Sequence, residues 1–133
     1  MAGAEDPQYI AELFGSFAPV DVRRMFGGAG LFVEGLMIGL VDDGVIYLKA
    51  DDQTIPAFER EGLEPFSYQT KSGSRSLNSY WRMPERLYDD PDELAQWAAQ
   101  ALQAARRATV RKSGPRTKVA RPKRNLRSKN KRV

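Results

Sequence analysis

The chain has 133 residues, and its net charge of +4 combines two parts of opposite sign. Residues 1–105 carry all 17 acidic and 8 of the basic residues, a net charge of −9, whereas the last 28 residues carry the other 13 basic residues and no acidic one. There is no cysteine and no histidine, which excludes disulfides, thiolate metal sites, cysteine nucleophiles and the usual general base.

A chain of this length is expected to fold as one domain with a single core. No apolar run reaches the roughly 18 residues of a membrane span, and the N-terminus lacks the basic flank and apolar stretch of a secretory signal. We therefore expect a cytoplasmic protein that makes no membrane contact, and the absence of cysteine fits a reducing compartment.

The first predicted element is a helix over residues 7–18. Asp6 is suited to cap this helix, and Pro7 to occupy its first position, where the missing N–H costs nothing. The apolar stripe of the helix consists of Ile10, Leu13, Phe14 and Phe17. Pro19 is expected to end it.

An antiparallel meander of three or four strands is predicted next. The strands cover residues 22–26, 31–34, 36–41 and 45–50. Glu34-Gly35 reads as a tight turn, and Asp43-Gly44 is the pair that a type I′ hairpin turn favours because both central residues take positive φ. In the last strand Ile46 and Leu48 are expected to face the core, with the residues between them on the other face.

The second half of the domain continues with helices and strands. A short helix is predicted over residues 54–61, and two further strands over residues 66–70 and 76–82, joined by a polar glycine turn. Pro84 opens a brief helical turn. A long helix is capped by Asp90, and its apolar stripe continues to Ala105.

The element order is therefore α, three or four β, α, two β, α. This order predicts an α+β domain of two layers over residues 1–108, in which helices pack on an antiparallel β-sheet. Residues 109–133 have no aromatic residue and no apolar periodicity, and their basic residues recur every two to four positions. We expect this segment to be a disordered basic tail.

Four sequence strings, taken in their order and spacing, resemble the N-terminal domain of the TfoX/Sxy family of competence regulators. They are Arg23-Arg24-Met25-Phe26-Gly27-Gly28, Gly30-Leu31-Phe32-Val33-Glu34-Gly35, Ile46-Tyr47-Leu48-Lys49 and Ser79-Tyr80-Trp81-Arg82-Met83-Pro84. The helix from Asp90-Pro91 through Leu94 and Trp97 also fits, so the resemblance covers roughly residues 7–108. It implies a two-layer α+β domain and a transcriptional co-regulator without a defined enzymatic site. In the competence regulators a helical C-terminal domain follows, whereas a basic tail follows here.

The C-terminal basic residues are the strongest physical signal in the sequence. Lysine and arginine side chains spaced along a chain neutralise phosphates and release counterions, which gives binding that ignores sequence and weakens with salt. We expect nonspecific nucleic-acid contact, with docking onto the acidic domain as the alternative. The candidate residues are Arg106, Arg107, Arg111, Lys112, Arg116, Lys118, Arg121, Lys123, Arg124, Arg127, Lys129, Lys131 and Arg132.

Few basic residues occur in the domain itself, and most of them lie in predicted strands or at strand ends. The candidates for binding an anionic ligand or a partner's carboxylates are Arg23, Arg24, Lys49, Tyr80 and Arg82. The alternative, which we favour, is that these bases form salt bridges within the acidic domain. Among the large apolar residues, those expected in the core or an interface are Phe26, Phe32, Trp81 and Met83.

Two further patterns suggest ligands but have simpler explanations. Gly27, Gly28 and Gly30 lead into a strand and lack the lysine, the serine or threonine and the helix of a phosphate loop, so they predict a bulge or tight turn. The pairs Asp42-Asp43, Asp51-Asp52 and Asp89-Asp90 lie at turns or helix starts, where aspartate is expected. We therefore expect no metal, no cofactor and no catalytic residue.

The leading hypothesis is a non-enzymatic regulatory or adaptor protein, in the role of a transcription co-regulator, that binds a protein partner or itself and contacts nucleic acid through its tail. One alternative is a small enzyme or ligand-binding domain that uses Arg23, Arg24 and Lys49 for an anionic substrate. The other is a structural homodimer or protein-interaction module.

Overall fold

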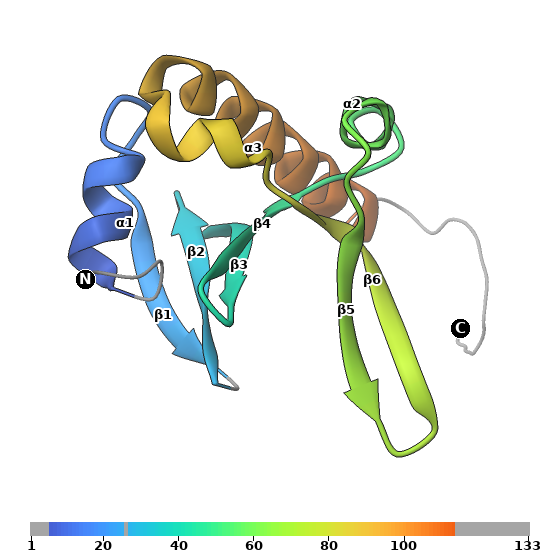
Figure 1. Ribbon diagram of the computed structural model, residues 1–133. Coiled ribbons are helices and arrows are strands. Elements are labelled where there is room, and N and C mark those ends of the chain that lie inside the picture. Colours follow the sequence, from blue (N-terminus) through green and yellow to red (C-terminus); the bar gives the residue numbers. More distant parts are fainter. Residues whose placement is uncertain (1–5, 26, 114–133) are drawn as a thin grey trace.

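The computed structural model describes residues 6–25 and 27–113 of the chain (Figure 1). The elements are, in order, α1 (Pro7–Leu13), β1 (Asp21–Met25), β2 (Gly28–Val33), β3 (Leu36–Asp42), β4 (Val45–Lys49), α2 (Ile55–Arg60), β5 (Pro65–Thr70), β6 (Gly73–Arg82), the 3₁₀ helix η1 (Glu85–Asp89) and α3 (Pro91–Ser113).

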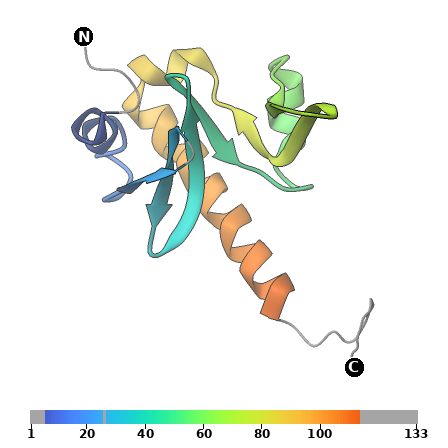
Figure 2. The same ribbon diagram turned by 90° about the horizontal axis from the view of Figure 1, so that it is seen from below.

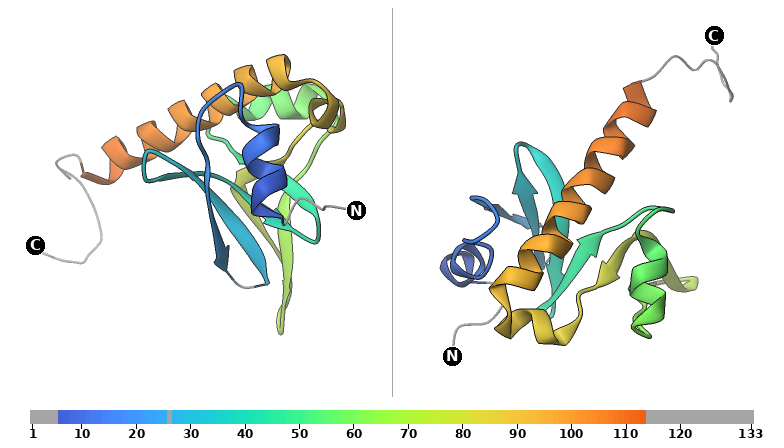
Figure 3. Two further views of the ribbon diagram at one scale, coloured as in Figure 1. Left: turned by 90° about the vertical axis from the view of Figure 1, so that its left-hand side faces the viewer. Right: turned by 90° about the horizontal axis from the view of Figure 1, so that it is seen from above.

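All six strands form one antiparallel sheet in the order β1-β2-β3-β4-β6-β5. Helix α3 packs across β3 and β4, while α1 contacts β1 and α2 contacts β6 (Figures 2 and 3). The predicted α+β class and the predicted order of helices and strands are confirmed. None of the described helices is both long and apolar enough to cross a membrane.

The hairpin turns follow from local backbone chemistry. Glu34 and Gly35 have φ values of 55° and 78°, and Asp43 and Gly44 have values of 52° and 76°. Two successive residues with positive φ make a type I′ turn, whose twist matches that of the flanking strands. Both turns therefore lie where the sequence predicts them.

The glycine-rich segment lies in the β1–β2 hairpin. Gly27 has a φ of +81°, and the chain continues from Gly28 directly into β2 rather than into a helix. A Cβ atom on Gly28 would collide with the carbonyl oxygen of Val41 on the neighbouring strand β3. Gly27 therefore serves the predicted tight turn, and Gly28 in addition permits a close approach of two strands that the sequence did not predict.

Helix α1 is shorter than the predicted 7–18. The Asp6 carboxylate accepts a hydrogen bond from the Gln8 N–H at 3.0 Å, so the predicted cap is confirmed. The helix ends at Leu13, and the next four residues form turns in which the Phe17 N–H donates to the Phe14 carbonyl at 2.9 Å. Gly15 has low helix propensity, so the chain leaves the helix before it reaches Pro19.

Helix α3 extends past residue 108, where the folded domain is predicted to end. Its N-terminus is capped as predicted, since the Asp90 carboxylate accepts from the Glu93 N–H at 3.1 Å. The helix continues to Ser113, because alanine, arginine and lysine are strong helix formers that outweigh Thr109 and Val110. The remaining residues of the predicted tail lie outside the described part of the chain.

The core lies between α3 and one face of the sheet. Ile46 and Leu48 are fully buried against this helix, as their alternation predicts, and Trp81 and Met83 are also core residues. Other fully buried side chains of the core are Ile38 on β3, Leu87 on η1, and Leu94 and Ala98 on α3. The strand residues that alternate with the core residues form the side of the sheet that faces away from α3, which we call the outer face.

Strands β5 and β6 extend beyond the other strands as a projecting hairpin (Figure 1). The register pairs Ser67 with Ser76 and Thr70 with Gly73, so only Lys71 and Ser72 form the turn and β6 begins three residues earlier than predicted. Every residue from 67 to 78 is exposed. We call residues 66–78 the arm.

Candidate binding surfaces

The outer face of the sheet also carries apolar side chains. Those that are half-buried and lie outside the core cluster are Met25, Phe32, Met37, Leu40, Val45, Tyr47 and Phe66. The ring of Phe66, at the base of the arm, meets the Tyr47 ring edge-on at 5.1 Å and stacks on Tyr68 at 6.0 Å. The apolar surface therefore continues from the sheet onto the arm.

A groove of about 270 Å³ lies where the arm leaves the sheet. Its apolar lining comes from both sides: Met25, Met37 and Leu40 from the sheet, and Phe66, Leu77 and Tyr80 from β5 and β6. Asp42 adds a carboxylate, and exposed Asp43 follows in the adjacent turn. This groove, the outer groove below, is an apolar depression with acidic side chains beside it.

Three of the five predicted ligand-binding residues lie close together on β4 and β6. The register places Lys49 opposite Tyr80, with the Lys49 ammonium 5.0 Å from the centre of the Tyr80 ring. Arg82 lies two residues further along β6 and is therefore on the same face. Burial raises the pKa of the Tyr80 hydroxyl, so this group stays protonated at neutral pH.

Arg23 and Arg24 lie elsewhere, on the edge strand β1. As neighbours on one strand they point to opposite faces of the sheet. The Arg23 guanidinium pairs with Asp21 at 3.0 Å and lies 4.3 Å above the centre of the Phe32 ring. For Arg23, the predicted salt bridging within the domain is therefore observed.

The five residues do not build one anion pocket. Two strands separate β1 from β4 in the sheet, and Lys49, Tyr80 and Arg82 border three different depressions. The hypothesis of an enzyme or ligand site that uses Arg23, Arg24 and Lys49 required these side chains to converge. They do not, and we do not propose that function.

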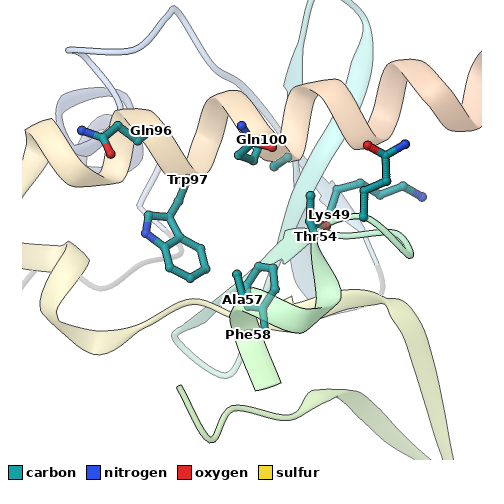
Figure 4. Close-up of a pocket in the computed structure, with 9 residues that line it drawn as sticks. Lys49, Thr54, Ala57, Phe58, Gln96, Trp97 and Gln100 are labelled. Carbon is teal, nitrogen blue, oxygen red and sulfur yellow. The ribbon is translucent and has the colours of Figure 1, made fainter. Parts of the chain in front are cut away.

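A second groove, of about 280 Å³, lies between α2 and α3 (Figure 4). Phe58 and Trp97 meet edge-on at 5.1 Å in this groove, and Gln96 and Gln100 line it from the same side as Trp97 (Figure 4). The groove also includes Lys49. Its lining is partly apolar and partly amide, and it has no carboxylate.

Arg86 joins the three helical elements near this groove. Its guanidinium makes two hydrogen bonds with Glu61, at 2.7 and 2.9 Å, and two with Glu93, at 2.7 and 3.0 Å. Glu93 also accepts from the Trp97 indole at 3.3 Å. Hydrogen bonds from Arg86 lower the pKa of both glutamates, so the arginine clamps two ionised carboxylates. This clamp fixes η1 against α2 and α3.

The first two C-terminal bases pair with acidic residues of the domain. Arg106 donates to Glu34 at 2.6 Å, and Arg107 makes two hydrogen bonds with Asp51, at 2.6 and 3.0 Å. For these two candidates the structure shows docking onto the acidic domain. Arg111 and Lys112 lie on α3, and the nine candidates from Arg116 to Arg132 lie outside the described residues.

The acidic pairs have structural partners rather than a shared ligand. Besides binding Arg107, the Asp51 carboxylate accepts from the Gln53 N–H at 3.1 Å, and Asp90 caps α3. Across residues 6–25 and 27–113, no three acidic side chains gather closely enough to hold a metal ion. The turn and cap explanations of these aspartates are therefore supported.

The bidentate contact between Asp51 and Arg107 leads to a prediction about pH. The hydrogen bond from Arg107 is the main reason that the pKa of Asp51 lies below its ordinary value of 3.8. A carboxyl whose pKa is lower in the folded state stabilises the fold above the unfolded pKa and loses this effect as pH falls through the folded pKa. Asp51→Asn should therefore lower the free energy of unfolding by about 1–2 kcal/mol near neutral pH.

Denaturant unfolding measured from neutral pH downwards checks this expectation. Asparagine still accepts the Gln53 hydrogen bond, so the substitution isolates the ion pair. The difference from wild type should shrink below about pH 3.8, where the unfolded-state carboxyl takes up its proton. The matched control is Asp52→Asn at the exposed neighbouring position, which should change little. A deficit that persists undiminished in acid would contradict the assigned role of Asp51.

Sequence reasoning missed the outer groove. Met37 and Leu40 belong to a strand that was correctly predicted, but their shared face depends on a bulge in the β2–β3 register at Leu31 and Phe32. The alternation of Phe66 and Tyr68 in β5 was an available signal for an apolar face on the arm. Phe32 lies on this outer face, and Phe26 lies outside the described residues.

These features define a small α+β domain that has an apolar outer face with a projecting arm and whose sequence ends in a run of bases. The model of the TfoX N-terminal domain matches residues 12–105, and the chain therefore belongs to this family, a domain of competence regulators. A relative, the DNA transformation protein TfoX1 of Aliivibrio fischeri (strain ATCC 700601 / ES114), is 33% identical over 84 residues. That match covers 63% of this chain and 40% of the relative.

Proposed function

We propose that this protein is a non-enzymatic regulatory adaptor that is held on nucleic acid by its C-terminal bases, while its domain contacts a protein. The observation that carries this proposal is the separation of charge. All 17 acids precede residue 106, and 13 bases follow it with no acid among them. Arg106 and Arg107 pair with the domain, and the proposal assigns contact with an external polyanion to the eleven bases that follow them.

Physical chemistry favours nucleic acid as that polyanion. Each lysine or arginine that neutralises a phosphate releases a counterion, and the segment after Ser113 has no aromatic side chain for base stacking. Binding should therefore be insensitive to sequence. With roughly 6 to 10 bases engaged, the logarithm of affinity should fall with the logarithm of salt at a slope of about −5 to −9.

A gel-shift titration of the full chain on duplex DNA and on RNA tests the proposal. The key variant replaces nine bases with glutamine while leaving α3 intact: Arg116, Lys118, Arg121, Lys123, Arg124, Arg127, Lys129, Lys131 and Arg132. This variant should lose at least about a thousandfold in affinity at low salt, and its salt dependence should flatten. The matched control exchanges lysine for arginine, and arginine for lysine, at the same nine positions.

The control should bind as wild type does, because the proposal attributes binding to charge and not to residue identity. Equal binding by wild type and the glutamine variant would overturn the proposal, and so would the absence of binding by wild type at about 50 mM salt.

A role in transcription is supported by the family membership and is tested by comparing transcript levels in cells with and without the gene.

The proposal that the domain is an adaptor rather than an enzyme draws on its surfaces. The chain has no histidine or cysteine, and the strand-borne bases Arg23, Arg24 and Lys49 do not converge. The outer face instead offers apolar area of the kind that marks protein contacts. The domain would provide specificity, and the C-terminal bases would raise its local concentration on nucleic acid.

A further inference from the structure

The arm has two chemically different faces. The register pairs Phe66 with Leu77 and Tyr68 with Arg75, so these four side chains share one face. The other face is formed by small or amide side chains: Ser67, Gln69, Ser74 and Ser76. On the first face Tyr68 is 42% and Leu77 37% exposed, which makes them two of the three exposed large apolar side chains among the described residues.

An isolated amphipathic hairpin is only marginally stable in water. Packing of its apolar face against something else stabilises it. Within the described part of this chain the contacts of this face lie near the base of the arm, where Phe66 meets Tyr47 and Leu77 lines one wall of the outer groove while staying partly exposed. The face that carries Tyr68 and Leu77 is therefore suited to a further surface.

Charge identifies the kind of surface that the arm fits. The arm contains two bases and no acid, although the rest of residues 1–105 contains 17 acids and six bases. The outer groove is apolar, and it is bordered by Asp42 with Asp43 beside it. An arm that presents Leu77, Tyr68 and Arg75 is thus complementary to a groove that presents Met37, Leu40 and Asp42.

We infer that the arm of one copy lies in the outer groove of a second copy, in a two-fold dimer. Each chain carries both halves of the contact, so a two-fold axis makes every contact twice, which is the ordinary arrangement of a homodimer. Tyr68 and Leu77 of one protomer pack against apolar groove residues of the other, and Arg75 faces Asp42 across the axis. This inference goes beyond the nucleic-acid proposal because every residue involved precedes the C-terminal bases.

The mass of the full chain, measured by light scattering after nuclease treatment, is the first test. Wild type should be a dimer at micromolar concentrations, and Leu77→Asp should be a monomer. Because Leu77 is already partly exposed, this variant should keep the wild-type circular dichroism spectrum. A wild-type monomer at all accessible concentrations, or a dimer that Leu77→Asp leaves unchanged, would overturn the inference.

Charge reversal tests the orientation of the arm in the groove. Arg75→Glu and Asp42→Lys should each weaken dimerisation by at least about tenfold, because each places like charges together. The double variant should recover most of the loss. The matched control is Arg60→Glu, which makes the same change in charge at an exposed position on α2. Failure of the double variant to recover would rule out the contact between Arg75 and Asp42.

Because the chain has no cysteine, single-cysteine variants can locate the interface directly. Leu77→Cys mixed with a size-tagged Met37→Cys chain and treated with a mild added oxidant should form a mixed disulfide, which is necessarily between copies. Ser76→Cys, on the other face of the arm, should form it far more slowly with the same partner. Equal rates would contradict the arm-in-groove arrangement. If the arm variants lowered the affinity for DNA and left the dimer mass unchanged, the arm would be a β-hairpin that binds nucleic acid, and the dimer contact would be ruled out.

Discussion

Gly28→Ala should destabilise the domain by at least about 3 kcal/mol, or prevent it from folding. A Cβ atom on Gly28 would overlap the carbonyl oxygen of Val41 and would lie 3.2 Å from the carbonyl carbon. That oxygen belongs to the backbone of β3, which pairs with β2 in the middle of the sheet. A flexible side chain would move aside, but here the two strands would have to separate.

The matched control is Gly35→Ala. Gly35 has a φ of +78° with no atom within 4 Å of an added Cβ, so alanine there costs only the left-handed backbone penalty of about 1–2 kcal/mol. Urea unfolding of both variants, followed by circular dichroism, should therefore give a clearly larger loss for Gly28→Ala. Equal losses would show that the close approach of β2 and β3 is not what requires glycine at position 28.

Features set by neighbouring residues could be predicted from the sequence alone. The Asp6 cap, the Asp43-Gly44 turn and the alternation of Ile46 and Leu48 each depend on fewer than five consecutive residues. Side-chain capping, backbone torsion and strand periodicity determine these three features, and the local sequence specifies each of them. These predictions are confirmed, and with them the α+β class.

Features set by distant residues could not be predicted in the same way. Arg106 and Arg107 resembled the other C-terminal bases in sequence, yet they pair with Glu34 and Asp51, 72 and 56 residues away. The outer groove similarly needs β3 and β6 to lie on either side of β4, a strand order that no local pattern specifies. The candidate surface therefore became visible only once the sheet order was known.

Lys49, Tyr80 and Arg82 show that even neighbouring side chains need not form one site. Their places in predicted strands or at strand ends made them candidates for binding an anion, and the β4–β6 register does bring them together. However, the sheet and helices divide the surrounding surface, so each residue borders a different depression. Proximity along two paired strands is not enough to build a ligand site, because the concavity comes from the elements packed around them.

Phe58→Ala should lower the free energy of unfolding by about 3–5 kcal/mol. Phe58 is 3% exposed and is the buried residue of α2, where its ring lies 6.0 Å from Trp81 and 5.1 Å from Trp97. A helix of six residues is too short to persist without tertiary contacts. Removing this ring therefore creates a cavity beneath the groove of Figure 4 and also releases α2 from the sheet and α3.

Both tryptophans of the chain contact Phe58, so tryptophan fluorescence reports this cavity and the unfolding transition together. Phe58→Leu is the matched control, since it keeps most of the apolar volume and should cost less than about 1.5 kcal/mol. Hydrogen exchange should show α2 amides losing protection in the alanine variant before those of α3, because α3 retains its contacts with β3 and β4. Simultaneous loss in both helices would mean that α2 is not an independently released element and that Phe58 instead stabilises the whole core.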